Sequence, residues 1–215
     1  MTDARKRVAV LISGRGTNMA ALVAAAADPG YPARIALVLS NNPAAPGLEI
    51  ARAAGIPAEA IDHRSFRGDR PAHEAAIDAR LRDAGVEYVC LAGYMRLLTP
   101  FLVNAWRGRM LNIHPSLLPA FPGLHTHERA LDAGAKLHGC TVHLVTEDMD
   151  AGPILAQAAV PVLPDDNADV LAARVLRMEN ALYPAALAAL VTGGGARPDP
   201  TAWLANPLPK PGALP

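Results

Sequence analysis

The sequence is poor in several features that mark particular classes of protein. Among its 215 residues only two are cysteines, Cys90 and Cys140, too few for a disulfide framework or a four-thiolate metal site. Both stand among apolar residues, so we expect reduced thiols in the core. Lys plus Arg and Asp plus Glu number 20 each, and this zero balance argues against a broad surface for nucleic acid or acidic membranes.

Long hydrophobic runs are also missing. The longest apolar stretch, residues 19–27, has nine residues, whereas a membrane helix needs roughly 20. The apolar run 8–12, which follows three basic residues, is too short for the core of a signal peptide. We therefore expect a cytoplasmic protein with no membrane segment and no nucleic-acid partner.

Short aliphatic runs alternate with helix-like segments through the first half of the chain. This pattern predicts strands at 8–12, 35–39, 58–61 and 86–92 and helices at 17–27, 46–54 and 70–84. The strands are apolar without alternation, which is typical of a parallel sheet covered on both faces.

The second half predicts three further strands and three further helices. The strands are expected at 110–113, 139–145 and 154–160, and the helices after Thr99, at 126–133 and at 168–191. The fold class is α/β, with a Rossmann-like, open, mostly parallel sheet of about seven strands and helices on both faces. One domain is expected over 1–192, followed by a proline-rich tail over 193–215 that Trp203 could dock.

A glycine-containing loop, Ser13-Gly14-Arg15-Gly16-Thr17-Asn18, joins the first strand to the first helix. Glycine lets the backbone approach an anion, and the free N–H groups of the helix start bind phosphate. Dinucleotide binding would need a third glycine where Met19 stands, and no Gly-Lys-Ser/Thr of an ATP-binding loop occurs. A phosphate monoester therefore suits the loop better than NAD or ATP, with an ordinary tight turn as the alternative.

Two polar residues at a strand end form a second candidate site. Asn112 and His114 flank Ile113, so both side chains point to one face, at the end of the sheet where open α/β folds bind ligands. An amide can donate to a developing oxyanion and an imidazole can move a proton. Asp150, in the loop after the sixth predicted strand, could orient the histidine and favour its charged form. The alternative is a histidine that satisfies a buried backbone group beside a solvated acidic loop.

Histidines are clustered, yet their spacing does not indicate a metal. Five of the seven lie between His114 and His143. His125 and His127 are two residues apart, and no His-Glu-x-x-His occurs, so neither matches a zinc signature. We expect no metal, and no nucleophilic cysteine either, because each thiol lies within an apolar strand.

Four segments together carry a resemblance to a known family. They are residues 10–18 (VLISGRGTN), 91–98 (LAGYMRLL), 111–127 (LNIHPSLLPAFPGLHTH) and 138–152 (HGCTVHLVTEDMDAG). From about residue 8 to residue 191 the chain resembles the phosphoribosylglycinamide formyltransferases. Its Asn-x-His-Pro-Ser-Leu-Leu-Pro run is shared with other folate-dependent formyltransferases, whereas Pro-Gly-Leu-His-Thr-His is more particular to this family.

The resemblance implies a reaction and its substrates. A formyl group would pass from the co-substrate 10-formyltetrahydrofolate to the amine of 5-phosphoribosylglycinamide, in de novo purine (IMP) biosynthesis. The amine would attack directly through a tetrahedral intermediate, with Asn112, His114 and Asp150 as catalytic residues. The N-terminal half would bind phosphate and the C-terminal half folate, in a monomer or homodimer. The family also suggests a cis bond before Pro119.

The resemblance further implies which residues bind each substrate. Phosphoribosylglycinamide would be held by Gly16, Thr17, Asn18, Met19, Ala20 and Glu179. Folate would contact Arg70, Met95, Arg96, Leu97, Leu98, Asn112, Thr146, Glu147, Asp148, Met149 and Asp150. The match at Arg70 requires a one-residue insertion near residues 68–69.

Three alternative functions are compatible with the same fold. A methionyl-tRNA formyltransferase would need a further C-terminal domain and a basic face for tRNA phosphates. A formyl-folate hydrolase would carry an extra N-terminal domain, whereas the glycine loop here begins at residue 13. A sensor of phosphate ligands could keep the fold without the chemistry, but intact Asn112, His114 and Asp150 argue against it.

Overall fold

The computed structural model describes residues 3–193, so the tail expected at 193–215, including Trp203, lies outside the described residues except for Gly193. The strands are β1 (Lys6–Ile12), β2 (Ala33–Ser40), β3 (Ala58–Ala60), β4 (Tyr88–Leu91), β5 (Met110–His114), β6 (Leu137–Leu144) and β7 (Ile154–Pro161). The helices are α1 (Thr17–Ala26), α2 (Gly47–Ala53), α3 (Arg70–Asp83), α4 (Pro100–Ala105), α5 (Thr126–Asp132) and α6 (Ala168–Val191), with a 3₁₀ turn at His63–Phe66.

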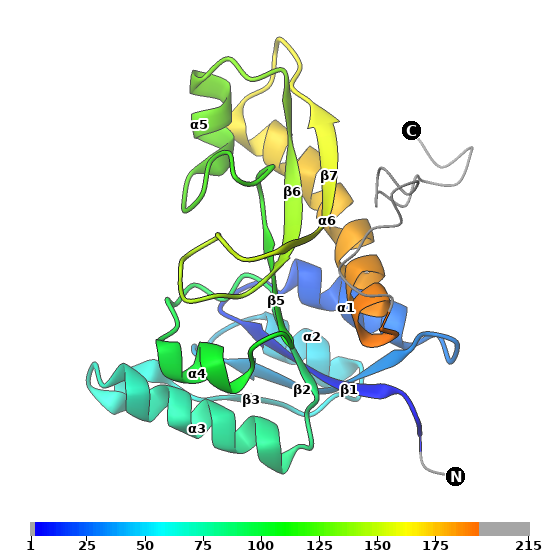
Figure 1. Ribbon diagram of the computed structural model, residues 1–215, viewed down its shortest axis with the longest axis vertical. Helices are drawn as coiled ribbons and strands as arrows, with labels where there is room; N and C mark the ends of the chain where they lie inside the picture. Colours follow the sequence, from blue (N-terminus) through cyan, green and yellow to red (C-terminus); the bar gives the residue numbers. More distant parts are fainter. Residues whose placement is uncertain (1–2, 194–215) are drawn as a thin grey trace.

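The strands form one sheet in the order β3-β2-β1-β4-β5-β6-β7. The first five are parallel, whereas β6 runs antiparallel to β5 and β7 antiparallel to β6. The long β6 and β7 extend beyond the other strands toward the top of Figure 1. This arrangement confirms the predicted α/β class, with seven strands that are mostly parallel.

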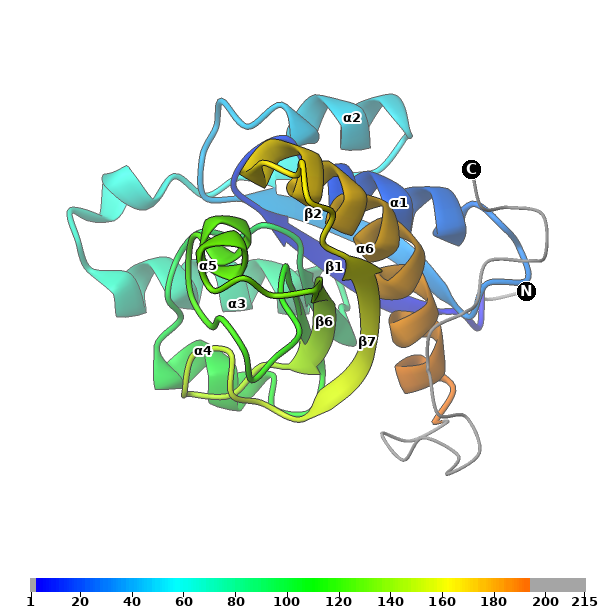
Figure 2. The same ribbon diagram turned by 90° about the horizontal axis from the view of Figure 1, so that it is seen from above.

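Helices cover the sheet on both faces. Figure 2 shows α1, α2 and α6 on one side and α3 and α4 on the other. Each face buries its own apolar cluster, one containing Leu22, Leu48 and Val175, the other Ile77 and Leu81. The central strands face both clusters, which explains their uninterrupted apolar residues.

Side-chain caps explain the starts of α3 and α6. Asp69 accepts from the Ala72 N–H at the start of α3, and Asn167 accepts from the Val170 N–H at the start of α6. The 3₁₀ turn at His63–Phe66 was not predicted from the sequence, although Asp62 caps it by accepting from the Arg64 N–H. It is a single turn, too short for a periodic pattern to reveal.

The sheet reverses its winding between β1 and β4, and the two loops that follow these strands contact each other there. The Ser13 N–H donates to the Gly93 carbonyl at 3.2 Å, and the Ser13 hydroxyl accepts from the Met95 N–H at 2.8 Å. Open α/β sheets bind ligands at such a switch point. The glycine loop and the segment from residue 93 to 98 are therefore neighbours across it.

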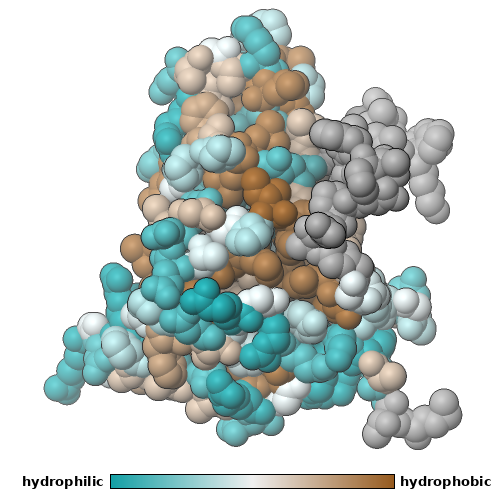
Figure 3. Space-filling view, viewed as in Figure 1, coloured by the Kyte–Doolittle hydropathy of each residue, from teal (hydrophilic) through white to brown (hydrophobic). Residues whose placement is uncertain are grey.

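The surface is uneven in polarity. Brown apolar residues run along the middle of the face in Figure 3, over β6 and β7, and the lower end of this face is mostly polar. Within residues 3–193, no helix combines the length and apolar character needed to cross a membrane.

Gly139 stands where β6 approaches β7 closely. A Cβ there would lie 1.9 Å from the Ala158 carbonyl oxygen on β7, a backbone atom that cannot yield without moving the strand. At Gly14 a Cβ would meet no atom within 4 Å, and the backbone is not left-handed.

We predict that Gly139→Ala lowers the free energy of unfolding by about 3 kcal/mol or more, because the added methyl overpacks the β6–β7 pair. Gly14→Ala should change it by less than about 1 kcal/mol. Urea unfolding of both variants checks this, and equal stabilities would contradict the packing argument.

Candidate active site

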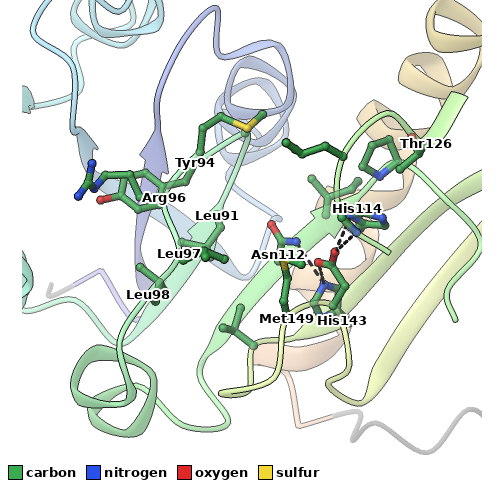
Figure 4. Close-up of a pocket in the computed structure, with 18 of the residues that line it drawn as sticks. Leu91, Tyr94, Arg96, Leu97, Leu98, Asn112, His114, Thr126, His143 and Met149 are labelled. Carbon is green, nitrogen blue, oxygen red and sulfur yellow. Dashed lines mark hydrogen bonds and ion pairs between the residues drawn. The ribbon is translucent and has the colours of Figure 1, made fainter. Parts of the chain in front are cut away.

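A pocket of about 720 Å³ opens at the carboxyl ends of β4 and β5. Its walls come from four places in the chain, namely the segment after β4, the end of β5 with the loop before α5, the end of β6, and the loop between β6 and β7. Figure 4 shows Asn112, His114 and His143 on one wall, with Leu97 and Leu98 on the facing wall. The site therefore pairs apolar surface with a few polar groups, as ligand pockets do.

Most residues predicted to contact folate line this pocket. They are Met95, Arg96, Leu97, Leu98, Asn112, Thr146, Glu147, Asp148, Met149 and Asp150, and His114 lies beside them. Arg70, at the first position of α3, does not contribute to the lining. Met95, Leu97 and Met149 are more than half exposed, so the mouth of the pocket offers apolar surface to a planar ligand.

Asn112 is oriented by a histidine that sequence analysis did not select. The contacts of His143 assign its tautomer, because its Nδ1 lies 3.0 Å from the Leu144 carbonyl and must carry the proton. Nε2 is then free to accept, and the Asn112 amide nitrogen lies 3.2 Å from it. Burial lowers the pKa of His143, which keeps the ring neutral as this arrangement needs. One amide hydrogen of Asn112 is thus held, and the second remains for a ligand in the pocket.

His114 lies between a backbone carbonyl and a carboxylate. Its Nε2 donates to the Phe121 carbonyl at 3.0 Å, and its Nδ1 lies 3.4 Å from Asp150 Oδ2. The same Asp150 oxygen accepts from the Gly123 N–H at 2.8 Å, and Oδ1 lies 3.8 Å from His143 Nε2. The contact of Nδ1 with Asp150 is longer than the bond of Nε2 to Phe121. Nδ1 is therefore the nitrogen that can more readily leave its partner and contact a ligand.

The loop after β5 is fixed by buried polar side chains. The bond between Leu118 and Pro119 is cis, as the family resemblance suggests. The Thr141 hydroxyl accepts from the Leu118 N–H at 3.0 Å and donates to the Ser116 carbonyl at 2.7 Å. Gln157 adds a bond from its amide to the Leu118 carbonyl at 2.8 Å. The antiparallel strands β6 and β7 therefore hold the loop whose Phe121 carbonyl accepts from His114.

The glycine loop lies outside this pocket, beside it at the switch point. Gly16 has a φ of 73°, and a Cβ there would lie 2.9 Å from the Met19 methyl and 3.1 Å from Gly47 Cα. The first turn of α1 has no acidic residue and no side-chain cap. Its N–H groups at Thr17, Asn18 and Met19 are consequently available to an anion.

Glu179 lies next to this turn on α6. It is 6 % exposed, and the Asn18 amide donates to its Oε2 at 2.8 Å. Burial raises the pKa of Glu179, while the bond from Asn18 acts in the opposite direction. Asn18 Oδ1 is buried and has no hydrogen-bond partner within the described part of the chain. Glu179 and Asn18 thus present polar atoms that could form hydrogen bonds with a ligand hydroxyl.

The two cysteines are buried and free, and burial raises the pKa of each thiol to about 12. Neither is therefore a nucleophile at neutral pH. Over residues 3–193 no group of three or more His, Cys, Asp or Glu side chains is arranged to hold a metal ion.

A second histidine pair lies at the site, and one of its members, His127, lines the pocket. His127 Nδ1 lies 3.1 Å from His138 Nε2, and the Phe121 ring lies edge-on to His138. His138 is 1 % exposed, and burial together with the neighbouring His127 lowers its pKa to about 4. The pair stays neutral near pH 7, so it adds no charge close to His114.

We predict a pH dependence of stability from His138. An unfolded histidine titrates near 6.5, so between pH 6.5 and 4 the unfolded chain binds more protons than the folded one. The free energy of unfolding therefore falls as the pH drops through this window. From pH 7 to 4.5 the wild type should lose up to about 2 kcal/mol more than His138→Gln, measured by urea unfolding. Parallel losses would show that His138 is not the group responsible.

Comparisons with known proteins place the chain in a family. A model of the formyl transferase family, described as "Formyl transferase", matches residues 6–187. A phosphoribosylglycinamide formyltransferase of Haemophilus influenzae is 40% identical over 208 residues, covering 96% of this chain and 98% of the relative. The crystal structure of a phosphoribosylglycinamide formyltransferase from Brucella melitensis is 57% identical with a TM-score of 0.84, covering 88% of this chain and 97% of the other.

Longer relatives match as well. The "Trifunctional purine biosynthetic protein adenosine-3" of Drosophila melanogaster is 50% identical over 195 residues, 90% of this chain, but the chain spans only 14% of that protein. The family model and the relatives of similar length show that the chain belongs to the formyl transferase family, among the phosphoribosylglycinamide formyltransferases.

Proposed function

We propose that this chain transfers the formyl group of 10-formyltetrahydrofolate to the amine of 5-phosphoribosylglycinamide, a step of de novo purine biosynthesis. The observation that carries the proposal is the convergence of Asn112, His114 and Asp150 on the polar wall of an otherwise apolar pocket. Family membership supports the reaction class, and the neighbouring glycine loop supports a phosphorylated acceptor.

The two substrates fit two adjoining places. The glycinamide's phosphate would bind the N–H groups at Gly16, Thr17, Asn18, Met19 and Ala20, and its ribose would meet Glu179. The folate would occupy the pocket, its ring system lying against Leu97 and Leu98. The contact between Ser13 and Met95 brings these two places together, so the amine and the formyl carbon can meet near Asn112.

The catalytic roles follow from the hydrogen bonds. Asn112 has one amide hydrogen held by His143 and directs the other at the oxygen that becomes negatively charged during attack. His114, once protonated at Nδ1, supplies a second donor there and passes that proton to the departing folate nitrogen. Asp150, in contact with Nδ1, orients the ring and is the nearest carboxylate to accept the proton released by the amine.

The same fold could also serve hydrolysis of the folate or binding without turnover. An absorbance assay of folate deformylation with purified protein separates these outcomes. The proposal expects turnover only when phosphoribosylglycinamide is added. Consumption of folate without it would indicate a hydrolase, and no consumption under either condition would indicate a sensor.

We predict that Asn112→Ala and His114→Ala fold but lose about 10²–10³ or more in kcat, because each removes a donor to the oxyanion. Asn167→Ala, which removes a helix cap remote from the pocket, serves as the control and should keep the wild-type kcat. Circular dichroism confirms folding, and the deformylation assay gives the rates. Normal turnover by either pocket variant would refute the catalytic assignment.

A further inference from the structure

The loop from Phe121 to His125 has an unusual backbone. Phe121, Gly123 and His125 all have positive φ angles, 53°, 79° and 57°. Residues with a Cβ rarely adopt this left-handed conformation, so two of the three need support from their surroundings. The loop therefore depends on contacts that stabilise a backbone in which every second residue has a positive φ.

Arg129, on α5, supplies such contacts. Its Nη1 donates to the carbonyls of Pro122 and Leu124, the latter at 3.3 Å, and its guanidinium carbon lies 5.6 Å from the centre of the Phe121 ring. A planar, permanently charged guanidinium can bond two carbonyls and stack on a ring at once, which a lysine cannot do. One side chain thus contacts Phe121, Pro122 and Leu124 of the loop.

The same loop holds His114 and Asp150 on the polar wall of the pocket. The Phe121 carbonyl accepts from His114 Nε2 at 3.0 Å, and the Gly123 N–H donates to Asp150 Oδ2 at 2.8 Å. The bond to Phe121 keeps a proton on Nε2 and leaves Nδ1 facing Asp150. A shift of this loop would free the imidazole to rotate and to exchange tautomers.

We propose that Arg129 is a positioning residue for formyl transfer, which sets the orientation and tautomer of His114 through the Phe121 carbonyl. The proposal rests on the proposed function for its kinetic consequence. Arg129 itself need not touch either substrate, since its bonds go to the loop and not to the reacting atoms. Its loss should therefore lower the rate of the chemical step more than the binding of the glycinamide.

The test uses full-length Arg129→Met, which keeps the aliphatic stem and removes the donors. We expect kcat to fall about tenfold while the KM for phosphoribosylglycinamide changes less than twofold. Arg129→Lys should recover only part of the rate, because one ammonium cannot bond both carbonyls and stack on the ring. Arg52→Met is the matched control, since exposed Arg52 also donates to a backbone carbonyl, that of Ala58, far from the pocket.

A spectroscopic readout separates positioning from simple stabilisation. Nitrogen-15 spectra of the histidine side chains, with the His114 signals assigned by His114→Ala, should show a protonated Nε2 in the wild type and an exchanging tautomer mixture in Arg129→Met. Unchanged His114 signals, or an unchanged kcat in an active enzyme, would overturn the proposal. A wild type without turnover would instead count against the proposed function, and the nitrogen-15 spectra would still decide the role of Arg129.

Discussion

The buried carboxylate of Asp150 is the interaction on which the candidate site depends. Its side chain is 9 % exposed, and a charge so removed from water must be compensated by donors. The Gly123 N–H provides one donor, and His114 Nδ1, which lies 3.4 Å from the carboxylate, provides a second when it is protonated. The carboxylate therefore binds the loop before α5 to the loop between β6 and β7, and these are the two loops that enclose the polar wall of the pocket.

The sheet explains why this assembly stands beside the glycine loop. The parallel strands β1 and β4 end at the switch point, where Ser13 and Met95 are hydrogen-bonded. The change to antiparallel pairing at β6 places His143 directly opposite Asn112. A continued parallel sheet would have required a crossover helix there, whereas the antiparallel pair brings a second histidine and the Asp150 loop to the same edge. The glycine loop and the pocket therefore adjoin at one edge of the sheet.

Sequence reasoning predicted the fold class correctly, and it placed Asn112 and His114 on one face, because both depend on local signals. Apolar runs, caps and glycines mark the elements, and the alternation of Asn112 and His114 on one strand fixes their common face. His143 was missed because its role comes from strand pairing with β5, which the sequence does not display. Arg129 was missed for a similar reason, since its bonds to Pro122 and Leu124 depend on the path of a left-handed loop. The division into one domain over 1–192 stays a prediction.

The most direct test of this account is the activity of Asp150→Asn. An asparagine can still accept from the Gly123 N–H, so the loops should stay joined, but it cannot pair with a charged His114 or accept a proton. We predict a folded protein whose kcat is lower by at least about 10²-fold, with Asp28→Asn, a remote surface change, as the control. Activity close to that of the wild type in Asp150→Asn would contradict the claim that this carboxylate organises the reaction.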